Sequence, residues 1–152
     1  MSSQLQLQIE NKFESIRELA DPVERFARDH GLDEQGTMSL NLAIVEWVSN
    51  IIKYSFDDHG GHVIDVRLSQ DDTKVKVDIF DTGKPFDPLQ APPPDLDSDI
   101  ESRPVGGLGI YIIKTVADAL QYRRESGRNH LKMWFSKSRQ ADRQAVDEAG
   151  TA

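Results

Sequence analysis

The sequence predicts an α/β (α+β) protein, a two-layer sandwich of one mixed, mostly antiparallel sheet with helices on one face. Two observations favour this fold class. The predicted elements run in the order strand, helix, helix, strand, strand, long loop, helix, strand, strand. Helices this few and this clustered can cover only one face of a sheet, which excludes a doubly wound parallel fold. The 152 residues fit a single domain that is large enough to bury a core.

The first half of the chain carries one strand and two helices. Apolar residues alternate with glutamines over residues 4–9, which is the period of a half-buried strand. Apolar residues then recur at helical spacing from Phe13 to Ala27. Pro22 lies inside this stretch and predicts a helix junction or a kink, because proline lacks the amide hydrogen that a helix interior uses. A second helix is predicted from about Asp33 to Phe56.

The second half begins with one hairpin and ends with another pair of strands. Residues 63–68 and 75–80 have the pattern of strands, and residues 69–73 connect them. Six of the seven prolines fall between Pro85 and Pro104, so we expect no regular structure in that loop. The remaining expected elements are a helix over residues 107–120 and strands over residues 121–125 and 131–135.

Composition and charge exclude several classes of function. A net charge of −8 argues against direct binding of nucleic acid through broad neutralisation of phosphates. The absence of cysteine excludes disulfides, thiolate metal sites and cysteine nucleophiles. No apolar run approaches the roughly 18–20 residues that cross a bilayer, and the N-terminus lacks a signal-peptide pattern, so we expect a cytoplasmic protein without a membrane partner. Residues 1–137 are predicted to form the single domain, and the polar residues 138–152 a disordered tail.

The stretch from Asp81 to Gly109 carries the strongest indication of function. Asp81 ends an apolar strand and Gly83 follows, and an acid in this place can accept a hydrogen bond from a ligand amino group. Gly106–Gly109 opens the next helix, where glycines let backbone N–H groups approach phosphate oxygens and the helix dipole favours negative charge. Each part alone is more often a turn or a plain helix start. Their order predicts a nucleotide pocket.

The second predicted helix adds a strip of polar side chains beside its apolar face. Glu46 and Asn50 are four residues apart and Lys53 follows three residues later, so the three share one side of the helix. An asparagine oxygen suits Mg²⁺, a glutamate can orient or deprotonate a hydroxyl, and a lysine adds positive charge near phosphates. Such a strip on its own is most often a solvated helix face. Together with the Asp81–Gly109 stretch, it predicts a single site.

These motifs together resemble the GHKL superfamily of ATPases, and most closely the small bacterial anti-sigma factor serine kinases. Residues Glu46–Phe56 resemble the N box of that superfamily, Asp81–Pro88 its first glycine box, and Gly106–Ile110 its second. Residues Gly127–Met133 follow the Gly-x-Asn-x-Leu-x-Met pattern that often ends the kinase sequences. The resemblance extends over about residues 5–137, with all motifs in order and at the spacing of the family.

The resemblance implies an ATP-binding Bergerat fold with a defined set of site residues. Asp81 would accept a hydrogen bond from the adenine amino group, and Gly83 would allow close approach. Asn50 would ligate a Mg²⁺ ion that bridges the phosphates, and Glu46 would be the catalytic base for the attacking hydroxyl. Residues 84–105 would form the ATP lid. The implied ATP-binding set is Asn50, Lys53, Asp81, Gly83, Phe86, Gly106, Gly107, Leu108 and Gly109.

The resemblance also implies an activity and partners. A kinase of this family uses ATP and Mg²⁺ to phosphorylate a serine or threonine of a STAS-type anti-anti-sigma protein, and it regulates transcription by binding a sigma factor. Relatives of this kind suggest a homodimer. A second interpretation is a nucleotide-dependent binding switch with negligible phosphoryl transfer. A histidine-kinase-type domain is disfavoured, because no helical hairpin with a phospho-acceptor histidine precedes the ATP-binding region. Phe86 has two interpretations, a contact with the base or a lid side chain that closes over the core.

Overall fold

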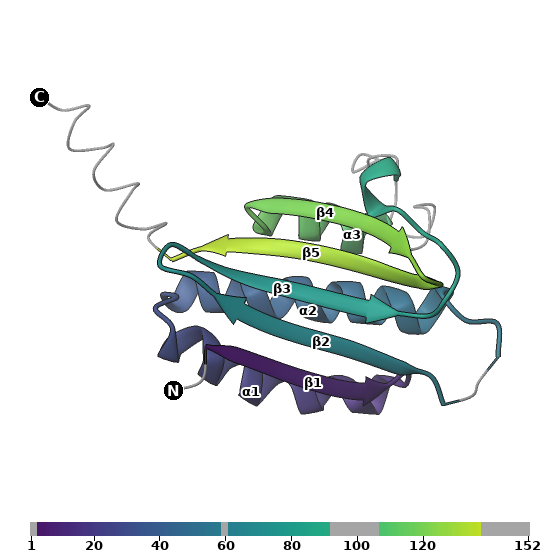
Figure 1. Ribbon diagram of the computed structural model, residues 1–152, viewed down its shortest axis with the longest axis horizontal. Coiled ribbons are helices and arrows are strands. Elements are labelled where there is room, and N and C mark those ends of the chain that lie inside the picture. The colour runs from purple at the N-terminus through teal and green to yellow at the C-terminus, as the bar shows by residue number, and fades with distance from the viewer. Residues whose placement is uncertain (1–2, 59–60, 92–106, 138–152) are drawn as a thin grey trace, which may run out of the picture.

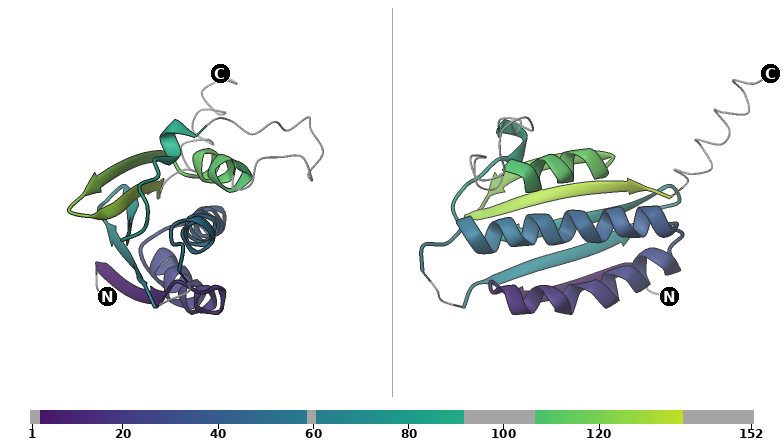
Figure 2. Two further views of the ribbon diagram at one scale, coloured as in Figure 1. Left: turned by 90° about the vertical axis from the view of Figure 1, so that its right-hand side faces the viewer. Right: turned by 180° about the vertical axis from the view of Figure 1, so that it is seen from behind.

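The computed structural model describes residues 3–58, 61–91 and 107–137 (Figure 1). Within these residues, three α-helices cover one face of a five-stranded sheet, as the turned views of Figure 2 show. The predicted two-layer sandwich is confirmed. None of the described helices is both long enough and apolar enough to cross a membrane. The elements are β1 (Gln4–Glu10), η1 (Phe13–Ile16), α1 (Arg17–Asp29), α2 (Glu34–Tyr54), β2 (Val63–Gln70), β3 (Lys74–Asp81), η2 (Pro88–Gln90), α3 (Gly107–Val116), β4 (Ala119–Glu125) and β5 (Arg128–Ser136), where η marks a 3₁₀ turn.

Every pairing between the described strands is antiparallel, whereas we expected a mixed, mostly antiparallel sheet. The order across the sheet is β1-β2-β3-β5-β4. Two helices carry the chain from β1 to β2, so β2 returns in the opposite direction. A single helix separates β3 from β4, and these two strands therefore run in the same direction. They do not pair, because β5 lies between them and runs opposite to both.

The alternating apolar residues of the strands face the helices. In the register of β1 and β2, Leu5 pairs with Leu68 and Leu7 with Val66, which places four apolar side chains on one face. The same alternation buries every second residue of β3 and β5. One core therefore fills the space between the sheet and the helices. Its largest fully buried side chains include Trp47, Phe135, Leu19, Leu40, Ile44, Ile51, Ile64, Leu68, Ile79, Ile113, Leu131 and Met133.

α1 continues through Pro22 without the junction that the proline predicts. The change of helix type lies earlier, where η1 gives way to α1 at Arg17. Proline at position 22 removes one backbone donor from the helix. Leu19 and Val23 on either side of it are fully buried, and this packing supports the helix across the missing hydrogen bond.

α3 ends at Val116, four residues before the end that we predicted. Leu120 fits the helical spacing but lies in β4. The Asp118 amide donates to the Trp134 carbonyl at 2.9 Å, and the Asp118 carboxylate accepts from the Ser136 amide at 2.6 Å. Pairing with β5 thus begins directly after the helix and competes with its extension.

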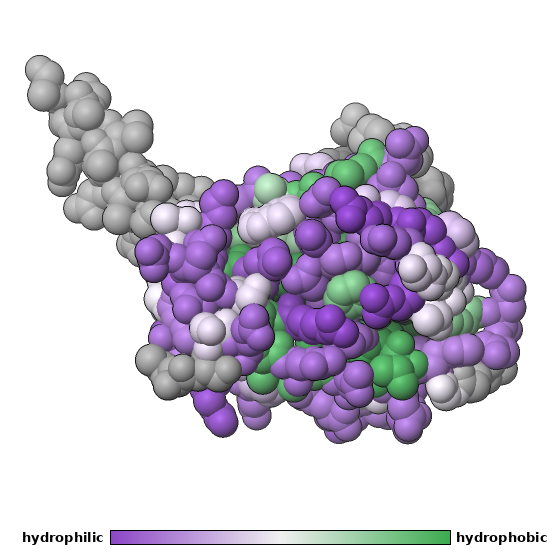
Figure 3. All heavy atoms as spheres, in the orientation of Figure 1, coloured by the Kyte–Doolittle hydropathy of each residue, from purple (hydrophilic) through white to green (hydrophobic). Residues whose placement is uncertain are grey.

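The outer face of the sheet is largely hydrophilic and is not covered by the described helices (Figure 3). On this face the Phe80 ring stacks on the His130 ring at a centroid distance of 4.1 Å. The guanidinium groups of Arg67 and Arg128 lie 4.7 and 4.4 Å from the centroid of the same ring. His130 also contacts the Asp78 carboxylate at 2.7 Å. None of the predicted site residues that the structure describes belongs to this cluster.

Candidate nucleotide-binding site

Asp81 is the last residue of β3, and only 2% of its surface is exposed. Its Oδ1 accepts hydrogen bonds from the Gly83 amide at 2.9 Å and from Asn129 Nδ2 at 3.0 Å. Its Oδ2 is also buried, and no donor among the described residues reaches it. A buried carboxylate oxygen without a donor is costly in free energy. Such an atom is well suited to accept a hydrogen bond from a ligand.

The environment of Asp81 changes its proton affinity. Burial raises the pKa of the Asp81 carboxyl above its ordinary value. The hydrogen bonds from Asn129 and Gly83 and the positive charge of Arg124 lower that pKa and so oppose the effect of burial. Arg124 donates to the Gly83 carbonyl at 2.6 Å, which holds the cation near the carboxylate. A carboxyl whose pKa is shifted by burial and specific partners is typical of a functional site.

Asn129 is the side-chain partner of Asp81, and our sequence prediction gave it no role. The two residues are paired in the register of β3 and β5. Asn129 Nδ2 also donates to the Lys84 carbonyl at 2.8 Å, and its Oδ1 accepts from the Tyr122 hydroxyl at 2.5 Å. The signal in the sequence was the asparagine of the Gly127–Met133 pattern, which indicated a family resemblance but no contact.

Gly83 packs against the end of α2. A Cβ atom added to Gly83 would lie 2.4 Å from the Cβ of Ser55 and 2.6 Å from the Ser55 carbonyl oxygen. The Lys84 amide donates to that carbonyl at 2.9 Å. We predicted that Gly83 allows close approach of a nucleotide. The structure adds a second reason for the glycine, since a side chain here would separate β3 from α2.

α2 carries the predicted polar strip. The helix begins after Asp33, whose carboxylate accepts a hydrogen bond from the Gly36 amide at 2.7 Å and so caps the N-terminus. Glu46 and Asn50 are half-buried on successive turns. Lys53 is exposed in the last turn and makes no ion pair with another described residue. The structure thus places Glu46 and Asn50 at the boundary of the core, and Lys53 outside it.

The second glycine box lies against this strip. A Cβ atom added to Gly109 would lie 2.8 Å from Oε2 of Glu46. Gly107 is the first residue of α3, and the Leu108 side chain is 43% exposed. Gly106 lies outside the described residues. The predicted catalytic carboxylate and the predicted phosphate-binding segment are therefore neighbours in space.

The predicted lid, residues 84–105, is described only in its first part. That part contains η2, a single 3₁₀ turn capped by Asp87, where we expected no regular structure. The Phe86 ring is 42% exposed and stacks on the Trp47 ring with a centroid distance of 6.3 Å. This contact supports the interpretation of Phe86 as a side chain that packs toward the core. Residues 92–105 lie outside the described residues.

The predicted magnesium ligand on α2, Asn50, has the donor chemistry that a magnesium ion requires. Asn50 offers an amide oxygen from a half-buried position on this helix. Magnesium usually keeps several waters and phosphate oxygens as ligands, so one or two protein donors are sufficient. No three His, Cys, Asp or Glu side chains among the described residues could hold a metal ion together. The ion would therefore depend on the phosphates of a nucleotide.

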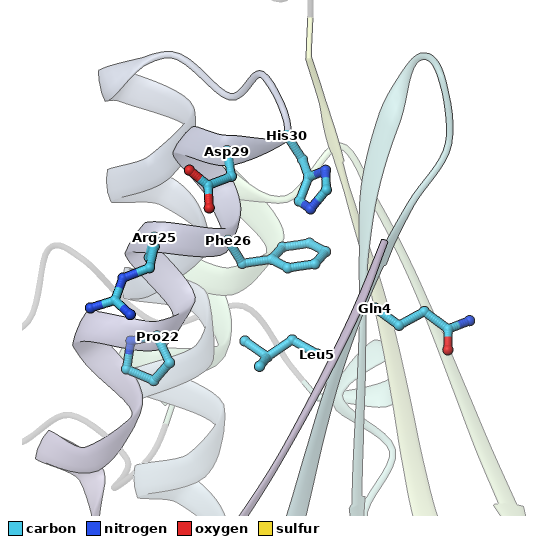
Figure 4. A pocket seen from close by; sticks show the side chains of 7 residues that line it. All are labelled: Gln4, Leu5, Pro22, Arg25, Phe26, Asp29 and His30. Carbon is cyan, nitrogen blue, oxygen red and sulfur yellow. The ribbon is translucent and has the colours of Figure 1, made fainter. Parts of the chain in front are cut away.

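A hollow lies between β1 and α1, away from the residues described above (Figure 4). It measures about 210 Å³. Figure 4 shows Leu5 of β1 and Phe26 of α1 facing each other across it, and the Phe26 ring contacts the His30 ring at 4.3 Å. None of the residues predicted to bind a nucleotide lines this hollow, and we do not include it in the candidate site. Its lining consists of Gln4, Leu5, Pro22, Arg25, Phe26, Asp29 and His30.

Comparison with known protein families supports the family that the motifs predict. The sequence model of the histidine kinase-like ATPase domain matches residues 9–135, which is most of the chain. The chain belongs to this ATPase family. The family predicted from the motifs is thus confirmed.

Two curated relatives of this ATPase domain are named as protein kinases. The chain is 32% identical over 95 residues to the serine/threonine-protein kinase BtrW of Bordetella bronchiseptica, covering 62% of this chain and 67% of the relative. It is 24% identical over 145 residues to the serine-protein kinase RsbW of Listeria monocytogenes, covering 93% and 91%. At the level of the family, the chain is therefore similar to serine-protein kinases of the RsbW type.

A solved structure supports the fold. The crystal structure of the RsbU and RsbW domains of a Mycobacterium tuberculosis protein matches 89% of this chain with a TM-score of 0.58 and 15% sequence identity. This chain spans 33% of the length of that chain. At this identity, the match supports the ATPase fold alone.

Proposed function

We propose that this protein binds ATP with Mg²⁺ and transfers the γ-phosphate to a serine or threonine of a STAS-type anti-anti-sigma protein. In this proposal it acts as an anti-sigma factor, and phosphorylation of the partner decides whether the sigma factor is bound. The names of the RsbW and BtrW relatives support the kinase part of the proposal.

The observation that carries the proposal is the free oxygen of Asp81. Asp81 Oδ1 already accepts two hydrogen bonds from the protein, whereas the buried Oδ2 accepts none from the described residues. The 6-amino group of adenine is a donor that would satisfy this oxygen. A purine with an oxygen at position 6 would instead place an acceptor against it and would be rejected. The site therefore favours adenine over guanine.

The remaining site residues have roles around the phosphates in this proposal. Gly107 and Gly109 at the start of α3 would bind phosphate oxygens through backbone N–H groups. Asn50 would hold Mg²⁺, which neutralises the charge of the phosphates when bound. Lys53 and Leu108 would complete the pocket at its exposed side. Catalysis would then rest on positioning and electrostatics at the γ-phosphate.

Glu46 is the residue that we propose as the general base. The oxygen of the partner's hydroxyl forms a bond to the γ-phosphorus, and the bond from that phosphorus to the β–γ bridging oxygen breaks, so ADP leaves. The hydroxyl proton passes to the Glu46 carboxylate. The position of Glu46 beside Gly109 supports this role, since it places the carboxylate next to the segment that would hold the phosphates.

The kinase proposal predicts that Glu46→Gln abolishes transfer and keeps nucleotide binding. Loss of a general base lowers the rate of transfer by about 10²- to 10⁴-fold. The measurement is transfer of labelled phosphate from ATP to a STAS protein encoded nearby, together with ATP affinity by calorimetry. Glu34→Gln is the matched control, because Glu34 is an exposed residue of the first turn of the same helix.

The same experiment separates the two candidate functions. If wild-type protein and the Glu34→Gln variant transfer phosphate and Glu46→Gln does not, the protein is a kinase. If the wild-type protein binds the STAS partner only with a particular nucleotide and transfers no phosphate, it is a binding switch. If Glu46→Gln transfers phosphate at the wild-type rate, the role given to Glu46 is wrong.

A further inference from the structure

A chain of hydrogen bonds links the segment that follows β3 to the Asp81 carboxylate. The Phe86 amide donates to the Tyr122 hydroxyl oxygen at 3.2 Å. The Tyr122 hydroxyl in turn donates to Asn129 Oδ1 at 2.5 Å, and Asn129 Nδ2 donates to Asp81 Oδ1 at 3.0 Å. Tyr122 lies on β4 and Asn129 on β5, the two neighbouring strands at the edge of the sheet in Figure 1. The chain therefore connects three strands and the first part of the predicted lid.

Each bond in this chain has one possible direction. The backbone N–H of Phe86 can only donate, so the Tyr122 oxygen accepts and its hydrogen is free for Asn129. Asn129 must then present its oxygen to Tyr122 and its amide hydrogens to Asp81 and to the Lys84 carbonyl, which lies 2.8 Å away. A flipped amide would place the Asn129 oxygen against two other acceptors. The Tyr122 hydroxyl and these two acceptors together hold the amide of Asn129 in one orientation.

The orientation of Asn129 determines what Asp81 offers to a ligand. With both Gly83 and Asn129 donating to Oδ1, that oxygen is fully engaged and Oδ2 is the atom left for a ligand. If the amide turned, Oδ1 would keep only the hydrogen bond from Gly83, and the carboxylate would be held less firmly and would take up a proton more readily. A protonated oxygen would present a donor in place of an acceptor.

We propose that Tyr122 is a positioning residue for the nucleobase site. Its hydroxyl fixes the Asn129 amide, and through it the acceptor oxygen of Asp81, while it also holds the backbone at Phe86. Tyr122 therefore strengthens the preference of the site for a base with a 6-amino group. This inference rests on the proposed binding of ATP.

The Tyr122 hydroxyl bonds both to the backbone of Phe86 and to the side chain of Asn129. The Phe86 backbone is held by Tyr122 of β4, and its ring lies on Trp47 of α2. The segment after β3 is therefore attached to the sheet and to the helix layer within one residue. A movement of this segment that breaks the bond at Phe86 would remove the donor to the Tyr122 oxygen, while the Tyr122 hydrogen could still reach Asn129.

The test compares two nucleotides in the wild-type protein and in Tyr122→Phe. ATP carries the 6-amino group, whereas purine riboside 5′-triphosphate has only hydrogen at that position and is otherwise the same. We expect the substitution to lower the affinity for ATP by about three- to tenfold, the effect of one lost hydrogen bond. The affinity for the analogue should stay nearly unchanged. The ratio of the two affinities should fall by the same factor. Tyr111→Phe is the matched control, since Tyr111 is a partly exposed tyrosine of α3.

A second measurement reads the orientation of Asn129 without any nucleotide. In the NMR spectrum of the wild-type protein, the two Asn129 side-chain N–H signals should be distinct and slow to exchange, as should the Phe86 amide. Both sets should exchange faster in Tyr122→Phe and stay unchanged in Tyr111→Phe.

The outcomes distinguish this inference from the proposed function. If Tyr122→Phe lowers the affinities for ATP and for the analogue equally, the effect is a general structural one and the inference is overturned. The inference is also overturned if neither affinity changes. Failure of the wild-type protein to bind ATP would overturn the proposed function, and the inference with it. A lowered preference for ATP together with faster exchange at Asn129 and Phe86 supports the positioning role.

Discussion

At the scale of single residues, Asp81 shows how a binding group opposes the stability of the fold. Its carboxylate is buried, one oxygen has no donor among the described residues, and burial raises its pKa. Between the ordinary pKa and the raised one, the folded state holds more protons than the unfolded state. Stability therefore falls as the pH rises through that window, and the loss is complete above the raised pKa. A ligand donor would compensate for this loss.

Asp81→Asn should remove this dependence on pH. The asparagine oxygen keeps the hydrogen bonds from Gly83 and Asn129, and the side chain does not titrate. We expect the variant to gain stability relative to the wild-type protein as the pH rises from about 4 toward 8. Urea unfolding of the nucleotide-free proteins across this range is the measurement. A difference in stability that is the same at every pH would contradict this prediction.

Asp81 and the two residues that orient it, Asn129 directly and Tyr122 through Asn129, differ in how far they could be predicted. Asp81 follows an apolar strand and precedes a glycine, and this local pattern is visible in the sequence. Asn129 reaches Asp81 because the two residues are in register on β3 and β5, and Tyr122 reaches Asn129 because β4 pairs with the other edge of β5. Neither the strand order nor the register follows from local periodicity. The acceptor was therefore predictable, and the residues that orient it were not.

At the scale of elements, the junction between β3 and α2 sets the geometry of the site. The Ser55 carbonyl at the end of α2 accepts a hydrogen bond from the Lys84 amide. Ser55 lies so close to Gly83 that position 83 has no room for a side chain. This contact places Asp81 next to the end of the helix that carries Glu46 and Asn50. The base acceptor and the polar strip are thereby held on one rigid pair of elements.

Gly83→Ala should destabilise the protein by about 2 kcal/mol, because the new methyl group would overlap backbone and side-chain atoms of Ser55. For a protein of this size, this corresponds to a fall in melting temperature of roughly 4–8 °C. Gly61→Ala is the control, since a Cβ atom there would meet nothing within 4 Å. Similar melting temperatures for the two alanine variants would show that a side chain at position 83 does not disturb the packing against Ser55.

The elements themselves were mostly predictable from hydrophobic period. All five strands and the three helices occur where the pattern placed them, within a few residues. The predicted end of α3 was wrong, because Leu120 satisfies both a helical and an alternating period and only its pairing partner on β5 decides between them. Of the junction or kink predicted at Pro22, the junction is absent, since buried neighbours stabilise a helix that the local rule would interrupt.

At the scale of the whole molecule, the site lies at one end of the two layers. β3 ends there, α2 ends beside it, and the start of α3 packs against α2 at Glu46. The family match over residues 9–135 covers all of these elements, and we propose that residues 1–137 form one ATP-binding domain. The proposed lid segment 92–105 and the predicted tail 138–152 lie outside the described residues.

The most direct test of this account is the affinity of the protein for ATP with Mg²⁺, measured by calorimetry for the wild-type protein and for Asp81→Asn. We predict that the wild-type protein binds and that the variant binds about ten- to hundredfold more weakly, because it replaces a charged acceptor by a donor. Asp72→Asn, an exposed change in the turn between β2 and β3, should bind as the wild-type protein does. Equal affinity of Asp81→Asn and the wild-type protein, or no binding by the wild-type protein, would contradict the account.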